Sequence, residues 1–87
     1  MNNVSVFSLS PNPAVNGLST LVYTINAASQ VNVSLYNELG QIVKIYVNTN
    51  RPAGIYNQPI DLTGLNRDIY FIRVNTESNS ITRKITL

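Results

Sequence analysis

Apolar and polar residues alternate in short runs along most of the chain, and the runs are separated by residues that favour turns. Val31, Val33 and Leu35, for example, alternate with Asn32 and Ser34. Successive side chains of a strand point to opposite faces, so this period of two predicts strands with one buried face. The pattern predicts strands over residues 4–9, 18–26, 31–36, 42–47, 55–62, 68–75 and 81–87.

Prolines mark two places where the strand pattern changes. Pro11 and Pro13 each lack a backbone donor and have a fixed φ, so we expect the first strand to stop before them. Pro59 predicts that its strand lies at a sheet edge or contains a bulge. Residues 48–54 are polar and contain a proline and a glycine, which predicts a loop.

Seven short strands in 87 residues, with no helical period between them, fit one all-β domain. Gly40 and Gly64 lie in short turns between strands, where glycine can take a positive φ. We predict a seven-stranded antiparallel immunoglobulin-like β-sandwich spanning residues 1–87, with a small closed barrel as the alternative. Its expected core consists of Leu21, Tyr23, Val33, Leu35, Tyr70, Ile72, Val74 and Ile85.

The composition argues against several kinds of chemistry. The chain has no cysteine and no histidine, so it lacks thiolate nucleophiles and the commonest general base and metal ligand. Charged residues make up only 11% of the chain, and the six basic residues are spread along it. Proteins that bind nucleic acid usually concentrate basic residues on one face. We therefore expect a non-catalytic domain with no cofactor and no nucleic-acid partner.

The chain contains neither a transmembrane pattern nor a leader pattern. No apolar run approaches the roughly 18 residues of a membrane-spanning helix, and no signal peptide opens the sequence. We expect a domain that does not itself span a membrane. If it is secreted, we expect it to be a fragment of a larger protein that carries the leader.

The acidic residues fall at expected turns or strand ends, where carboxylates commonly cap backbone donors. Nothing in their spacing pairs two of them for catalysis. A weak calcium site built from Asp61, Asp68 and backbone carbonyls stays open as an alternative. The four acids are Glu38, Asp61, Asp68 and Glu77.

The five tyrosines have two interpretations. Aromatic rings on a sheet face can stack on sugars, but aromatic residues also favour strands for packing alone, and the chain has no tryptophan. Tyr70 carries a more specific prediction. Residues 65–70 resemble the corner before a sandwich strand, in which a tyrosine hydroxyl bonds back to the backbone a few residues upstream.

Four segments, taken in order, resemble the type A C-terminal sorting domain of cargo proteins of the type IX secretion system in Bacteroidetes. They are a Pro-Asn-Pro element, an aromatic–turn–glycine segment over 35–43, a leucine-rich turn with alternating apolar residues over 62–74, and a basic, β-branched strand over 82–87. The resemblance covers essentially the whole chain. It assigns recognition residues Pro11, Asn12, Pro13, Gly40, Gly64, Leu65, Tyr70, Ile72, Val74, Arg83, Lys84 and Ile85.

One position departs from the family pattern. Asp68 stands where the family usually has glycine before the Ile-Tyr pair. Aspartate tolerates left-handed backbone better than most residues, so we expect the turn to survive.

The resemblance implies that the domain is an address for export. It implies that a folded cargo in the periplasm is passed through the outer-membrane translocon and received by an outer-membrane barrel shuttle. A sortase then removes the domain and, in many members, joins the cargo to lipopolysaccharide. The expected location is thus the periplasm in transit to the cell surface or the medium.

An immunoglobulin-like spacer or a carbohydrate-binding accessory module of a secreted protein is the alternative. The final predicted strand coincides with the end of the chain, which favours the sorting domain. We predict that residues 81–87 carry much of the signal, because an edge strand offers unpaired backbone groups to a partner strand. Arg83 falls on the apolar face of this strand, where it either reaches the rim or meets a partner.

Overall fold

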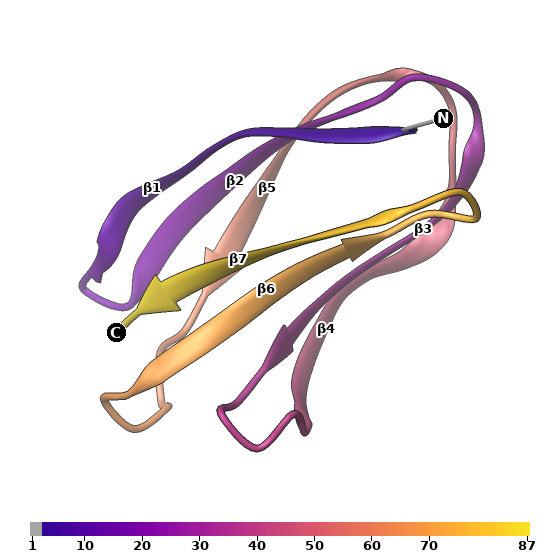
Figure 1. Ribbon diagram of the computed structural model, residues 1–87. Helices are drawn as coiled ribbons and strands as arrows, with labels where there is room; N and C mark the ends of the chain where they lie inside the picture. The colour runs from indigo at the N-terminus through magenta and orange to yellow at the C-terminus, as the bar shows by residue number, and fades with distance from the viewer. Residues whose placement is uncertain (1–2) are drawn as a thin grey trace.

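The computed structural model describes residues 3–87; residues 1 and 2, on which the absence of a leader pattern partly rests, lie outside it. Within this range the chain forms antiparallel strands and no helix (Figure 1). One sheet has the order β1-β2-β5, and the other has the order β4-β3-β6-β7. The strands are β1 (Val4–Val15), β2 (Leu18–Ile25), β3 (Ser29–Tyr36), β4 (Ile42–Arg51), β5 (Gly54–Asp61), β6 (Ile69–Asn75) and β7 (Ser80–Thr86).

The two facing sheets confirm the predicted all-β antiparallel sandwich rather than the closed barrel (Figure 1). In a constant-type immunoglobulin domain the fourth strand pairs with the fifth. Here β4 pairs with β3 and lies in the opposite sheet from β5. Strand β5 is therefore an edge strand, as Pro59 predicts.

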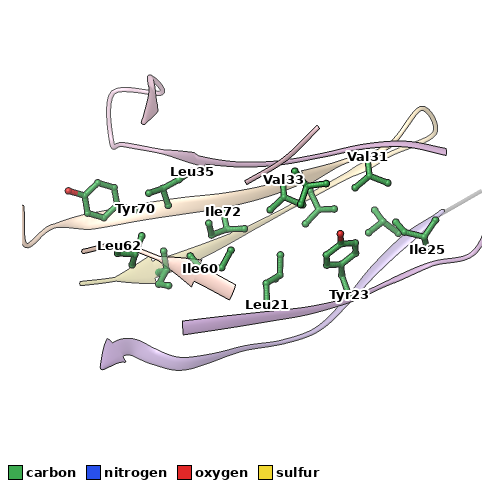
Figure 2. Packing of buried hydrophobic residues seen from close by; sticks show 14 residues of the cluster. Leu21, Tyr23, Ile25, Val31, Val33, Leu35, Ile60, Leu62, Tyr70 and Ile72 are labelled. Carbon is green, nitrogen blue, oxygen red and sulfur yellow. The ribbon is translucent and has the colours of Figure 1, made fainter. Parts of the chain in front are cut away.

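The core fills the space between the two sheets (Figure 2). All eight core residues expected from the alternation are buried. Tyr23 of β2 and Leu35 of β3, which enter the core from different sheets, have no exposed surface. The structure adds further apolar residues from five strands and one turn: Val4, Ile25, Val31, Val47, Ile60 and Leu62.

Strand β1 is longer than predicted. It continues through Pro11 and Pro13 to Val15, with cis peptide bonds before both prolines. The expectation that the strand stops before Pro11 is wrong. Strand β1 lies at a sheet edge, and its pairing with β2 is irregular between Ser10 and Val15. The missing N–H groups of the prolines therefore interrupt no regular ladder.

The loop predicted over residues 48–54 is also wrong, because most of it is strand. Strand β4 extends to Arg51 by pairing with the polar start of β3, where Arg51 lies opposite Ser29. Residues 48–50 are exposed, so no apolar alternation marks this half of the strand. The predicted ends of the second, third, fifth, sixth and seventh strands agree with the structure to within two residues.

The corner predicted at Tyr70 is confirmed. The Tyr70 hydroxyl donates a hydrogen bond of 2.7 Å to the carbonyl oxygen of Asn66, four residues upstream. The positive φ of this loop, 83°, belongs to Gly64, and Asp68 has no positive φ. The turn survives as expected, and an aspartate in place of glycine fits there without left-handed backbone.

Side chains of β4 bond to the end of β5 at one margin of the sandwich. Lys44 Nζ and the Tyr46 hydroxyl both donate to the carbonyl oxygen of Asp61, at 3.0 and 2.9 Å. Burial, followed by the charge of Asp61, raises the pKa of Tyr46 to about 12. The hydroxyl is thus protonated and able to donate at neutral pH.

Candidate recognition site

The C-terminal strand β7 lies at one edge of the four-stranded sheet. It pairs on one side with β6, where Ile85 lies opposite Tyr70 and Arg83 lies opposite Ile72. No strand of residues 3–87 forms a ladder with its other side. Strand β1 of the opposite sheet lies beside it there (Figure 1). The topology therefore meets the condition on which the predicted recognition by this strand depends.

The outer side of β7 presents backbone donors and acceptors. Alternate residues of an edge strand direct both their N–H and C=O groups away from the neighbouring strand. The carbonyl oxygen of Lys84 and the N–H of Thr86 point outward, because both bond to the side chain of Asn12 in β1. The same alternation places the backbone groups of Ser80 and Thr82 on the outward side.

Asn12, between the two prolines, bridges the two sheets. Its Nδ2 donates a 2.9 Å bond to the Lys84 carbonyl oxygen, and its Oδ1 accepts a 3.2 Å bond from the Thr86 N–H. The buried Ser19 of β2 anchors this segment by donating its hydroxyl, at 2.9 Å, to the carbonyl oxygen of Pro11. The structure thus brings the first and last family motifs together.

The two basic residues of β7 are both exposed, while their neighbour Ile85 has no exposed surface. Arg83 reaches the rim of the sandwich, where its Nη1 donates a 3.3 Å bond to the carbonyl oxygen of Thr82. Lys84 lies on the outer face of the sheet, in register with Phe71 of β6. The strand is therefore held by Ile85 and presents two positive charges in the two residues before that anchor.

The remaining motif residues do not gather at β7. Gly40 and Gly64 have φ of 80° and 83° in the turns before β4 and β6. Leu65 packs against the core, and its N–H bonds to the carbonyl oxygen of Leu62 at 3.2 Å. Tyr70, Ile72 and Val74 are buried in β6. These residues shape the domain, whereas Asn12, Arg83 and Lys84 lie at its surface.

Comparison with known protein families identifies the kind of domain. The family described as secretion system C-terminal sorting domain matches residues 8–87. The chain belongs to this family. It is thus a C-terminal sorting signal for type IX secretion, which acts in export to the cell surface or the extracellular space. No curated protein and no solved structure gives a significant match. Residues 3–87 contain no helix that is long and apolar enough to cross a membrane.

The acidic residues of the sorting domain have structural partners. Asp61 Oδ1 accepts bonds from the hydroxyl and the N–H of Thr63 at 2.6 and 2.9 Å, and these bonds lower the pKa of Asp61. A hydrogen bond with Asp68, and then the charge of that residue, raise the pKa of Glu38. Within residues 3–87 no three acidic side chains gather around a common centre, and Asp61 and Asp68 bond to different neighbours.

The tyrosines of the sorting domain form no common sugar-binding platform. Tyr23 and Tyr70 are core residues. Tyr46 and Tyr56 bond to backbone carbonyls at the margins of the sandwich. Tyr36 lies on the outer face, opposite Phe71 of the neighbouring strand. The rings are therefore divided among the core, two margins and one face.

Sequence reasoning missed the two asparagines that join β1 to the opposite sheet. The family motif alone points to Asn12, and nothing in the sequence points to Asn79. Asn79 Oδ1 accepts bonds from the N–H groups of Asn3 and Val4 at 2.8 and 3.2 Å. Asparagine is abundant in this chain, and partners more than seventy residues away leave no local pattern. The flanking prolines were the only signal that singled out Asn12.

Proposed function

We propose that the sorting domain directs a cargo protein through the outer-membrane translocon of the type IX system by presenting β7 to the machinery. The observation that carries this proposal is the family match over residues 8–87. The outer edge of β7, which pairs with no strand of residues 3–87, and its exposed basic residues support it. An edge strand can be extended by a strand of another protein, with backbone bonds providing affinity and alternate side chains providing specificity.

The proposed partners are the translocon, an outer-membrane barrel shuttle and a sortase. The sortase removes the domain after export, so the domain is present in the periplasm only in transit. In this role the domain is one part of a larger secreted protein. It catalyses nothing and needs no cofactor, since its contribution is a shape and a set of backbone and charged groups.

Fusion of residues 1–87 to a periplasmic reporter in a type IX host tests the proposal. The reporter should reach the cell surface or the medium, and the exported reporter should lack the domain. The same reporter without the domain is the control and should stay in the periplasm. Retention of the fusion in the periplasm would instead favour a spacer, whereas export with the domain still attached would remove only the sortase step.

A further inference from the structure

The contact between Asn12 and β7 has the chemistry of a strand pairing. A carboxamide carries the same N–H donor and C=O acceptor as a peptide group. The Asn12 carboxamide donates to the carbonyl oxygen of Lys84 and accepts from the N–H of Thr86. These two groups flank Ile85, and a neighbouring strand would bond to the same outward-facing groups. This part of the edge therefore already binds an amide.

The hydrogen bonds between Asn12 and β7 lie where another strand could replace them. Asn12 itself is exposed, and both of its bonds to β7 lie at the surface. The anchor of β7 is separate, because Ile85 is buried and pairs with Tyr70 of β6. The carboxamide can thus leave β7 without unpacking the strand.

We propose that Asn12 is a removable cap on the outer edge of β7, and that the capped edge binds an extended backbone segment of the protein that reads the sorting signal. This inference rests on the proposed function and adds the group that controls access to its site. The incoming strand replaces the carboxamide at Lys84 and Thr86. It reaches the outward backbone groups of Thr82 and Ser80 when β1, which lies beside β7, moves aside. Capping also protects the free domain from pairing with unrelated strands.

Two substitutions separate the bonds of the cap. Asn12→Ala removes both bonds, while the isosteric Asn12→Asp keeps an acceptor for the Thr86 N–H and loses the donor to Lys84. Asn57→Ala is the matched control, since Asn57 is an exposed asparagine of β5, the far edge strand of the other sheet.

The hydrogen-exchange rate of the Thr86 amide directly measures its bond to Asn12. Asn12→Ala should accelerate this exchange about fivefold, as expected for the loss of one typical hydrogen bond. Asn12→Asp and Asn57→Ala should leave it within about twofold of the wild-type rate. Unchanged exchange in Asn12→Ala would overturn the cap.

Export of reporter fusions tests whether Asn12 controls the access of a partner strand to β7. A cap lowers the fraction of molecules that are ready to bind, so its removal raises apparent affinity. Early after induction, both Asn12 variants should show a surface-to-periplasm ratio about two- to fivefold above wild type and Asn57→Ala. A ratio equal to or below wild type would show that Asn12 does not control access to β7. If the wild-type fusion itself fails to export, the proposed function and the control of access by Asn12 fail together. Hydrogen exchange of the Thr86 amide still decides whether Asn12 caps β7.

Discussion

At the scale of single residues, this sorting domain depends on side chains that bond to backbone groups. Tyr70 does so within its own loop, at Asn66. Asn12 does so across 72 residues of sequence, at Lys84. The first contact could be predicted because its spacing is a known corner of sandwich folds. The second could not, because it depends on how β1 and β7 meet after the two sheets pack.

Substitution of Tyr70 tests the corner. Tyr70→Phe removes the bond to Asn66 and should lower the free energy of unfolding by about 1 kcal/mol. Tyr70→Ala also leaves a cavity beside Leu35 and Leu62 (Figure 2), and should cost roughly 3 to 5 kcal/mol. Urea denaturation measures both changes. Midpoints equal to wild type for both variants would remove the corner from the account of stability.

The Asp61 carboxylate predicts an acid-sensitive contribution to stability. Bonds from the hydroxyl and then the N–H of Thr63 hold the pKa of Asp61 below its ordinary value. A group whose pKa is lowered by folding stabilises the folded state above its unfolded pKa, and this stabilisation disappears as the pH falls through its folded pKa. The stability advantage of wild type over Asp61→Asn should therefore shrink on acidification.

Urea denaturation of wild type and Asp61→Asn between pH 7 and pH 2 measures this difference. Asparagine keeps an oxygen acceptor for Thr63, so the comparison isolates the charge. A difference in unfolding free energy that stays constant over the whole range would contradict the assignment.

At the scale of elements, the strands followed the alternation where one face is buried and departed from it elsewhere. The pattern over β6 was clear because Tyr70, Ile72 and Val74 all enter the core. The second half of β4 is exposed and polar, so its pairing with β3 left no trace in the sequence. The proline rule failed in β1 because an edge strand can tolerate missing donors.

Deletion of residues 84–87 tests whether β7 is needed for the fold. The deletion removes Ile85 from the core and both partners of Asn12. It should lower the unfolding free energy by about 2 to 5 kcal/mol or more, since truncating a buried isoleucine alone usually costs that much. Export of the reporter should cease. Urea denaturation and surface labelling measure the two effects. Normal export after the deletion would show that the signal lies outside the terminal strand.

At the scale of the whole molecule, the sandwich class could be predicted from the sequence. The contacts between the edge strands of its two sheets could not. Alternation and turns predict two sheets with a shared core. They do not specify which edge strands become neighbours, because that depends on the twist and offset of complete sheets. The candidate site lies on such a margin, where Asn12 of one sheet meets Lys84 and Thr86 of the other. Only the family motif pointed to the residues involved.

If the export machinery recognises β7 on an intact domain, substitution of the two basic residues of this strand should impair export. Arg83→Ser with Lys84→Ser removes two exposed side chains and keeps Ile85 and the backbone bonds to Asn12. Such surface changes usually alter the unfolding free energy by less than about 0.5 kcal/mol, so the domain should stay folded.

The measurement is the surface fraction of a reporter fused to this double variant, relative to the wild-type fusion, with urea denaturation confirming the fold. Recognition of β7 through these side chains predicts a clear loss of surface reporter with unchanged stability. Export at the wild-type rate from a folded double variant would contradict it, since these basic side chains would then form no part of the signal.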